Sequence, residues 1–316
     1  MTGEPMTTLK EAPPVDRTAP VRKAGLADRE GFLAWAMLLP SVVYIVALVG
    51  VPFVLAIAFA FSDVTTGDPS FDWVGFANFD AIFDDGVFWR SLTNTLVFTL
   101  VSMLLIVVFG KILANILVAD FRGKWVVRFL VLLPWTTPVA LSTISWLWFL
   151  DSIYSPVDWV LRRLGLIEDN VVWLGGPGTA MASVIAVHVW RLTPLAAVIV
   201  MAGLVAIPRD IDEAARIDGA GFWRRMFEVT IPMTMPVIAV SALFGAILTF
   251  TDMTVSYVLT RGGPTHATDV LASWAYFRGI EGGDVGQGAA IALFLFPLLL
   301  AAAIAILRAV RRLGAS

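Results

Sequence analysis

His188 and Arg191, in a long apolar segment, are the first residues in this chain whose types and spacing suggest chemistry. They are three positions apart, so on a helix they would share one face. A charged side chain at the centre of a membrane span costs about 2.5–3.5 kcal/mol on insertion scales, so it usually faces a cavity or a partner. Asp252 and Lys111 lie in two other apolar segments. These groups are therefore candidates for lining a substrate pathway.

Each candidate also has a structural explanation. Arg191 and Asp252 carry opposite charges and can form a buried ion pair that joins their two segments. Lys111 lies near one end of its segment, where its side chain can extend toward the membrane surface, and Asn115 is one helical turn away. Pro194 would remove a helix hydrogen bond close to Arg191. The sequence leaves both the pathway and the ion pair open.

No catalytic set is apparent in the sequence. There is no Cys, which excludes a disulfide framework and a thiolate site. Neither His188 nor His266 has metal-ligating residues nearby, and the chain contains no G-x-x-x-x-G-K-[ST] loop for ATP. The formal net charge of −3 argues against a nucleic-acid partner. We expect no catalytic residue, no metal site and no cofactor bound by this chain.

The composition indicates several membrane spans. Hydrophobic residues make up 58% of the chain and charged residues 15%, whereas a soluble domain has about 25% charged residues. A span needs about 20 apolar residues. Apolar segments of that kind occur at about 32–61, 92–118, 126–150, 179–207, 236–260 and 287–307. The predicted fold is an all-α polytopic membrane protein with six transmembrane helices.

The polar segments complete the expected organisation. Residues 1–31 are polar and contain prolines, so we expect a disordered cytoplasmic tail. Residues 32–61 form the first transmembrane helix and 62–91 an extracytoplasmic connector. Residues 92–312 form a core of five transmembrane helices that includes a cytoplasmic hairpin at 208–235, and 313–316 are a tail.

The orientation follows from the distribution of Lys and Arg, which accumulate on the cytoplasmic side. Most of them lie in the amino-terminal tail, around connector 119–125, in connector 208–235 and at the carboxyl terminus. The other connectors carry few: Arg90, Arg162, Arg163, Arg261 and Arg278. Both termini and the hairpin are therefore predicted to be cytoplasmic.

The hairpin begins with the stretch IPRDIDEAARIDGA, whose residue types favour a short helix. Asp210 followed three residues later by Glu213 resembles a capping box, and Gly219 is placed to end the helix in a left-handed turn. FWRRMFEVT then predicts a second amphipathic helix, interrupted by Pro232 and Pro236 before the next span. Such a hairpin can rest on lipid headgroups or dock a soluble partner, and Arg224 and Arg225 are expected to contact headgroups or phosphates.

The stretch EAARIDGAGFWRRMFEVTIP, residues 213–232, resembles the EAA signature of the membrane subunits of ABC importers. That signature has Glu-Ala-Ala, a Gly after three further residues and an apolar ending before Pro. Val229 and Ile231 stand where the signature has Ile and Leu. Asp218-Gly219-Ala220 is typical of the carbohydrate-uptake branch.

Other motifs extend the resemblance over about residues 32–312. They are VGFANF (74–79), FWRSLTNT (88–95), RGKWVVRFLVLLPWTTP (122–138), VWRLTP (189–194), GLVAIP (203–208) and YVLTRGGPTHAT (257–268). The ordered set is far more specific than one EAA match. The chain is thus identified as resembling a permease subunit of this branch.

The resemblance implies a coupling role for the hairpin. Glu213, Ala214, Ala215, Asp218 and Gly219 would seat in a groove of the ATP-binding subunit, although Glu213 could also serve only as a capping residue. The implied partners are a second homologous permease subunit, two copies of an ATP-binding subunit that carry ATP and Mg, an extracytoplasmic substrate-binding protein or lipoprotein, and membrane lipid. The location would be the bacterial inner membrane, and the chain itself would not be an enzyme.

The resemblance also places Arg191, Leu195, Thr249 and Asp252 where sugar-importer subunits touch substrate. His188 and Phe250 join them as pathway candidates, and Trp190 and Phe250 are aromatic groups that could stack on a sugar. The family often has amides at the positions near Asp252, so a carboxylate there departs from its pattern. The substrate would be a disaccharide of the trehalose or maltose type or another oligosaccharide. A glycerol-3-phosphate or polyol importer, a stand-alone secondary transporter and a structural membrane scaffold are the alternatives.

Overall fold

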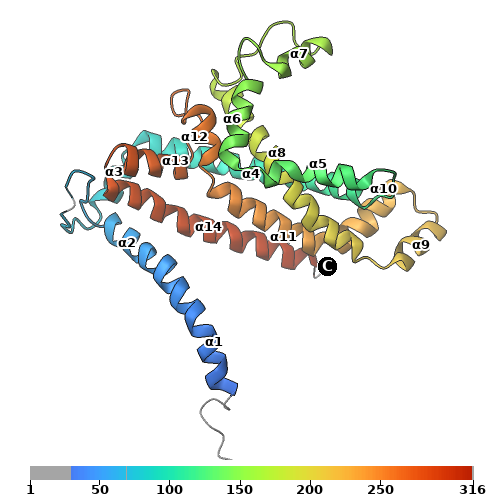
Figure 1. Ribbon diagram of the computed structural model, residues 1–316, viewed down its shortest axis with the longest axis horizontal. Coiled ribbons are helices and arrows are strands. Elements are labelled where there is room, and N and C mark those ends of the chain that lie inside the picture. Colours follow the sequence, from blue (N-terminus) through green and yellow to red (C-terminus); the bar gives the residue numbers. More distant parts are fainter. Residues whose placement is uncertain (1–29, 69, 315–316) are drawn as a thin grey trace, which may run out of the picture. The chain divides into compact units, whose positions relative to one another are not determined.

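The computed structural model describes residues 30–68 and 70–314 (Figure 1). The predicted tail over residues 1–31 therefore lies almost wholly outside the described residues, as do the last two residues of the chain. The described part is helical, and its β-structure is limited to one isolated bridge between Ser62 and Trp73. The chain divides into two units, one ending at Val54 and the other beginning at Leu55.

The described part of the first unit is one apolar helical path. It consists of α1 (Glu30–Ile45), a π-helical turn (Val46–Gly50) and the beginning of α2 (Val51–Ala60), which continues into the second unit. Residues Ala34–Ala60 form a stretch that is long and apolar enough to cross a membrane. This stretch coincides with the first predicted span at 32–61.

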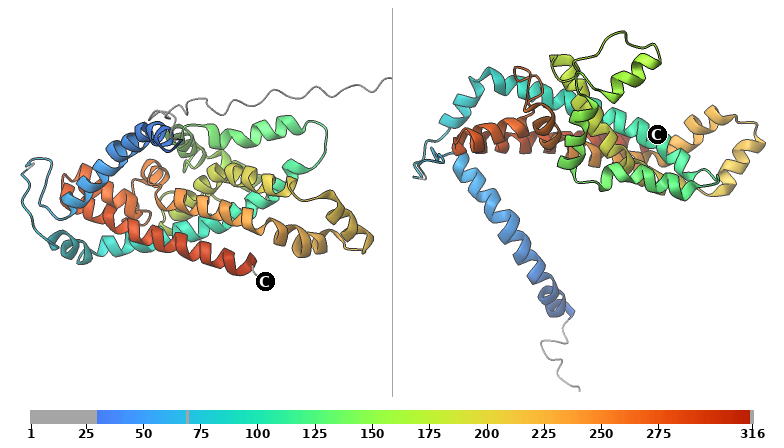
Figure 2. Two further views of the ribbon diagram at one scale, coloured as in Figure 1. Left: turned by 90° about the horizontal axis from the view of Figure 1, so that it is seen from below. Right: turned by 45° about the horizontal axis from the view of Figure 1, so that its top comes forward.

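The second unit is a helical bundle with short helices at both ends (Figures 1 and 2). Its elements in chain order are α3 (Ala77–Phe83), α4 (Gly86–Val118), α5 (Lys124–Thr136), α6 (Val139–Phe149), α7 (Pro156–Arg163), α8 (Pro177–Val205), α9 (Arg209–Ile217), α10 (Phe222–Arg225), α11 (Ile231–Phe250), α12 (Thr254–Thr260), α13 (Leu271–Tyr276) and α14 (Val285–Gly314).

The described residues contain five helical stretches that are long and apolar enough to cross a membrane. A sixth is present if α5 and α6 count as one broken span. The region of the predicted span at 126–150 is thus two helices that meet at a bend of 99°, and not one continuous helix. Pro138 explains the break, since a proline disfavours the helical conformation of the residue before it, and Thr137 is extended (φ −77°, ψ 138°).

The predicted span at 236–260 is also interrupted. Helix α11 ends at Phe250, and α12 begins only at Thr254. In the gap, the Asp252 carboxylate accepts a hydrogen bond from the Val255 backbone N–H at 3.1 Å, as a capping side chain does at a helix start. The interruption therefore places a carboxylate between two helices.

Two prolines follow π-helical turns in the same register. Val46–Gly50 precedes Pro52, and Met226–Thr230 precedes Pro232, so each proline is two residues beyond the turn. A proline ring collides with the carbonyl four residues earlier, and the wider π turn relieves that collision. The prediction that Pro232 and Pro236 interrupt the helix was wrong, since Phe222–Phe250 forms one continuous helical path.

The centre of the bundle is the contact between α4 and α8, against which α11 also packs. A Cβ built on Gly110 of α4 would lie 2.7 Å from the Cβ of Ala196 on α8, so the two backbones approach closely. Buried side chains such as Phe98, Ile106 and Leu192 fill the surrounding core. This close packing positions α8 and α11, whose polar side chains face each other.

Candidate functional site

An ion pair joins α8 to the break after α11. Arg191 Nη2 lies 2.6 Å from Asp252 Oδ2, and the two side chains are 13% and 9% exposed. Asp252 Oδ1 is occupied by the Val255 N–H. The ion pair that the sequence left open is therefore present in this conformation, and it ties the start of α12 to α8.

His188 adds a third ionisable group to this cluster, three residues before Arg191. Thr249 Oγ1 is 2.6 Å from the Gly245 carbonyl, to which it donates, so its oxygen is left to accept from His188 Nε2 at 2.9 Å. This assignment places the proton of a neutral imidazole on Nε2. His188 Nδ1 then presents a lone pair 3.7 Å from Asp252 Oδ2.

Two buried polar atoms of the cluster have no hydrogen-bond partner among the residues that the structure describes. They are His188 Nδ1, an acceptor in the tautomer above, and Arg191 Nε, a donor. Buried polar groups in proteins are nearly always paired, so an unpaired donor and an unpaired acceptor at the same carboxylate require an explanation. A hydroxyl group is the simplest group that can both accept from a guanidinium N–H and donate to an imidazole nitrogen.

The other pathway candidates lie around this cluster in different ways. Thr249 and Phe250, at the end of α11, are buried, and Thr249 holds His188. Leu195, one turn after Arg191, lines a small hollow between α4, α8 and α11 with apolar neighbours such as Leu192 and Leu248. The structure thus brings His188, Arg191, Thr249 and Asp252 together, whereas Leu195 faces a separate apolar hollow.

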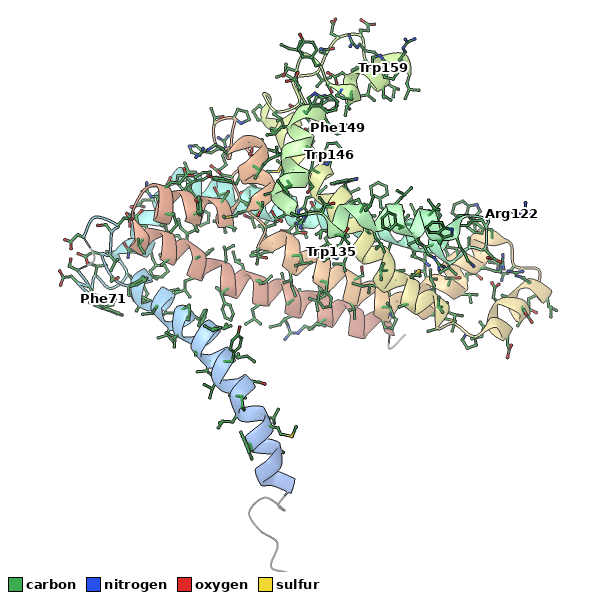
Figure 3. All side chains as sticks on the ribbon, viewed as in Figure 1. Phe71, Arg122, Trp135, Trp146, Phe149 and Trp159 are labelled. Carbon is green, nitrogen blue, oxygen red and sulfur yellow. The ribbon has the colours of Figure 1, made fainter. Side chains whose placement is uncertain are left out.

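Trp190 belongs to a different surface. It lines an open hollow of about 580 Å³ with residues of α4, α5 and α8, among them Phe109, Pro134 and Pro194. Its ring also meets the Trp146 ring of α6 edge-on, with centroids 5.4 Å apart. Figure 3 shows Trp146 on α6, the helix that leads away from the bundle toward α7 and Trp159.

Phe98 is a contact residue that the sequence analysis missed. Its ring on α4 packs against the His188 imidazole with a centroid distance of 4.8 Å. Phe98 is one of many apolar residues of α4, so its residue type did not indicate a contact with His188. Only the packing of α4 against α8 shows which phenylalanine covers the cluster.

The EAA stretch forms a short helix and a tight turn at one end of the bundle (Figure 1). Helix α9 begins at Arg209 after Pro208, and no side-chain hydrogen bond caps its start. The predicted capping box of Asp210 and Glu213 was therefore wrong, because the helix begins one residue earlier and Asp210 lies inside its first turn. Acidic residues in that turn still complement the helix dipole.

The predicted left-handed turn at Gly219 is confirmed, with φ of 76°. The Ala220 N–H donates to the Ala215 carbonyl and the Gly219 N–H to the Arg216 carbonyl, each at 3.0 Å. These two bonds form a Schellman motif, which ends α9 at a sharp turn. Glu213, Ala214, Asp218 and Gly219 are exposed on this element, and Ala215 is partly buried.

Asp212 is a second residue that the sequence analysis missed. Its carboxylate binds Arg216 one turn along α9 at 2.8 Å and Arg225 of α10 at 2.9 Å. This carboxylate therefore links the two arms of the hairpin. Arg122 lies at the same end of the unit as the hairpin, and Phe71 lies at the opposite end (Figure 3).

Within the described residues, no three His, Asp or Glu side chains gather closely enough to hold a metal ion. The site consists instead of a buried polar cluster between helices and a capped surface hairpin. The Thr249 hydroxyl lies beside His188 Nε2 in this cluster, but it donates its proton to the Gly245 carbonyl and not to the imidazole. The arrangement is suited to binding and conformational coupling.

Comparison with known proteins identifies the family. Residues 106–314 match the family described as "Binding-protein-dependent transport system inner membrane component". The chain belongs to this family. The family is named for the inner membrane, and the several apolar helices of the chain agree with a multi-pass membrane protein.

Curated relatives cover most of the chain. The sulfoquinovosyl glycerol transport system permease SmoG of Agrobacterium fabrum is 32% identical over 90% of this chain and 92% of its own length. The trehalose/maltose transport system permease MalF of Thermococcus litoralis is 33% identical over 90% and 95%. The diacetylchitobiose uptake permease DasB of Streptomyces coelicolor is 30% identical over 93% and 94%.

A solved structure shares the fold. It belongs to a bacterial ABC transporter involved in the import of the acidic polysaccharide alginate, and the comparison gives a TM-score of 0.76 at 23% identity. It covers 89% of this chain and 96% of that chain. At this identity the likeness supports the fold alone.

Proposed function

We propose that this chain is the permease subunit of an ATP-driven importer for a disaccharide of the trehalose or maltose type or another oligosaccharide. The observation that carries the proposal is the α9–α10 hairpin, which presents the EAA residues on a capped, exposed turn in a chain of the inner membrane component family. Relatives named as trehalose/maltose and diacetylchitobiose permeases support the substrate class.

In this proposal the hairpin transmits force and performs no bond chemistry. Glu213, Ala214, Ala215, Asp218 and Gly219 seat in a groove of an ATP-binding subunit on the cytoplasmic side. Two features suit that role: the Schellman turn fixes the direction of the hairpin, and Asp212 links its two arms. Hydrolysis of Mg-ATP occurs on the partner subunits, so this chain is not an enzyme.

The polar cluster forms part of the substrate pathway. His188, Arg191, Thr249 and Asp252 are the groups that a sugar hydroxyl would meet, with Phe250 as an apolar neighbour. Leu195 lines the separate hollow one turn further along α8. The unpaired His188 Nδ1 and Arg191 Nε support this role, because the imidazole nitrogen can accept a hydrogen bond from a hydroxyl group and the guanidinium N–H can donate one. When α8 and α11 separate, the Arg191–Asp252 pair opens and each charged group exchanges its partner for substrate.

The full transporter contains a second homologous permease, two ATP-binding subunits and an extracytoplasmic substrate-binding protein. In this proposal the chain has six transmembrane segments, with α5 and α6 as one broken span, and both termini and the hairpin are cytoplasmic. Lys and Arg support this orientation, since they concentrate at the hairpin end and near the carboxyl terminus.

Reconstitution in proteoliposomes tests the proposal. The chain is co-expressed with its neighbouring permease and ATP-binding genes, and uptake of labelled trehalose and maltose is measured with the binding protein present. We expect uptake that requires ATP and the binding protein. ATP-independent uptake by the single chain, driven by an ion gradient, would instead identify a secondary transporter. Preference for glycerol 3-phosphate or a polyol would refute the sugar assignment.

A further inference from the structure

A groove along α4 ends in a cluster of basic side chains, which neither the ion pair nor the EAA turn uses. The groove has a volume of about 660 Å³ and lies between α4 and the helical path through α10 and α11. Its deeper lining is apolar, with Val107 and Val108 on one wall and Met235 and Ile238 on the other. Lys111 and Asn115 are the polar groups of its α4 wall.

A second, polar hollow of about 240 Å³ continues the groove toward the hairpin. The two hollows share Asn115, Phe222 and Met226 as lining residues, so they form one continuous feature. Arg216 and Arg225 line the second hollow together with Asp212. The feature therefore changes from apolar to basic along its length.

Basic side chains outnumber carboxylates at the polar end of the groove. Lys111 is 8% exposed, and its Nζ donates to Asn115 Oδ1 at 3.2 Å. No carboxylate among the described residues pairs with it. In the described part of the chain, Asp212 is the one carboxylate that lines the polar hollow, and it already binds both Arg216 and Arg225. Arg225 Nε is buried and has no hydrogen-bond partner within residues 30–68 and 70–314.

We propose that this groove binds one anionic phospholipid of the cytoplasmic leaflet. The acyl chains lie along the apolar wall of α4 and α11, and the phosphate lies among Lys111, Asn115 and Arg225. The buried, unpaired Arg225 Nε–H and the ammonium of Lys111 supply donors of the kind that phosphate oxygens accept. The distribution of Lys and Arg predicts that this end of the bundle is cytoplasmic, which is where basic residues meet anionic headgroups.

The lipid would affect the hairpin directly. Arg225 is held by Asp212 of α9, so a phosphate at Arg225 contacts the same ionic link that joins the two arms. The exposed rings of Phe222, Trp223 and Phe227 lie at the rim, where aromatic residues commonly meet headgroups. A bound anionic lipid would therefore stabilise the hairpin in one orientation.

Native mass spectrometry with two lipids that have identical acyl chains tests the proposal. The purified full chain, in the complex in which it is stable, is titrated with 1-palmitoyl-2-oleoyl phosphatidylglycerol or phosphatidylcholine. We expect the wild type to bind phosphatidylglycerol at least about fivefold more tightly. Lys111→Gln and Arg225→Gln should each remove about fivefold of that affinity and weaken phosphatidylcholine binding less, because the choline cation already opposes the basic side chains.

Charge-keeping and distant variants serve as controls. Lys111→Arg and Arg225→Lys should keep the preference, which separates charge from folding. Lys124→Gln removes a basic residue at the start of α5, where it pairs with Asp120, and should also keep the preference. Equal binding of the two lipids by the wild type would overturn the proposal. So would a loss of phosphatidylglycerol affinity in Lys124→Gln as large as in Lys111→Gln or Arg225→Gln.

Two further arms distinguish other occupants. Inorganic phosphate should not displace phosphatidylglycerol at matched concentration, since it has no acyl chains, and efficient displacement would indicate a free-anion site instead. A cysteine introduced by Phe227→Cys at the groove rim should react with lipid-soluble maleimide in membranes. Quantitative cross-linking of that cysteine to a second polypeptide, with no phosphatidylglycerol bound, would show that a protein covers the groove.

Discussion

Arg191 and Asp252 are 61 residues apart in the chain, yet their side chains meet at 2.6 Å between α8 and the start of α12. His188 Nδ1 lies 3.7 Å from the same carboxylate oxygen. The pair therefore closes the gap between the two helices and also restrains the interruption after Phe250. Its burial makes each partner depend on the other for folding.

A double-mutant cycle separates the structural role of this pair from its proposed role in transport. Removing one partner of a buried ion pair typically costs about 3–5 kcal/mol, because the other charge is stranded. We expect Arg191→Leu and Asp252→Leu each to lower the yield of folded protein in detergent, and the double variant to restore yield. Transport should stay impaired in all three, since sugar hydroxyls lose their polar partners. Recovery of both yield and transport in the double variant would assign the pair a structural role alone.

The Gly219 turn provides a prediction about coupling. Its φ of 76° costs a residue with a Cβ about 1–2 kcal/mol, with Asn the best tolerated replacement. We expect Gly219→Leu and Glu213→Lys to abolish ATP-driven uptake, and Gly219→Asn to retain most of it. Membrane insertion should be unchanged, because Glu213 and Gly219 lie outside the apolar stretches.

Glu168→Lys is the matched control for Glu213→Lys, since it makes the same charge change on an exposed residue of the segment between α7 and α8. It should transport at the wild-type rate. Binding of the ATP-binding subunit, measured by co-purification, should fall in Glu213→Lys alone. Wild-type uptake in a Glu213→Lys, Gly219→Leu double variant would exclude a coupling role.

Close packing of α4 on α8 predicts sensitivity at Gly110. An added Cβ would lie 2.7 Å from Ala196 Cβ and 3.3 Å from the backbone of the same helix. Overpacking of this kind typically costs about 1–3 kcal/mol, so Gly110→Val should lower the thermal unfolding temperature in detergent. Gly178→Ala, with open space around the new methyl group, is the control. Gly110→Ala should be rescued in part by Ala196→Gly, and an unchanged melting temperature in Gly110→Val would contradict the packing.

Much of this architecture was predictable because its signals are local. Apolar length predicted the spans near α4, α8, α11 and α14, and a glycine in a turn sequence predicted the left-handed residue at 219. The bend at Thr137 was present in the sequence as Pro138, but its angle depends on what α6 packs against. A proline predicts a weakened helix without saying whether the helix breaks or continues through a π turn.

The site was less predictable because its contacts are distant in sequence. His188 and Arg191 were identified as sharing a face, yet the partners Thr249 and Phe98 follow from how α8 packs against α11 and α4. The link from Asp212 to Arg225 likewise requires the fold of the turn between them. Residue type identifies buried charge, and only tertiary packing shows which groups satisfy it.

The loop after α12 carries a carboxyl group, that of Asp269, whose contribution to the stability of the fold depends on pH. Burial raises the pKa of the Asp269 carboxyl above its usual value of 3.8, and the hydrogen bond to His266 at 2.7 Å opposes the rise. A carboxyl with a higher pKa in the folded state binds protons more tightly there, so its contribution to stability is lost as pH rises from 3.8 through the raised value. As pH rises over that range, we expect the free energy of unfolding of the wild type to fall relative to that of Asp269→Asn. Thermal unfolding of both proteins at a series of pH values measures the difference, and a pH-independent value would refute the assignment.

Asp158 is the buried anchor of the segment around α7. Its carboxylate accepts hydrogen bonds from the Trp173 indole N–H at 2.7 Å and the Val171 backbone N–H at 3.0 Å, and the residue is 0% exposed. Asp158→Ala leaves both donors without a partner, at about 1–3 kcal/mol each. We expect the segment between α6 and α8 to open while the bundle remains folded, because the lost bonds lie within that segment.

Limited digestion with trypsin measures this opening, since Arg162 and Arg163 at the end of α7 are its cleavage sites. We expect Asp158→Ala to be cut there several times faster than the wild type, with no change in the thermal unfolding of the bundle. Glu168→Ala, an exposed acidic residue of the same segment, should be cut at the wild-type rate. Asp158→Asn keeps one acceptor oxygen, so its cleavage rate should lie between those of Asp158→Ala and Glu168→Ala. Equal cleavage in Asp158→Ala and Glu168→Ala would show that the carboxylate does not hold the segment, and that the packing of Trp173 alone is sufficient.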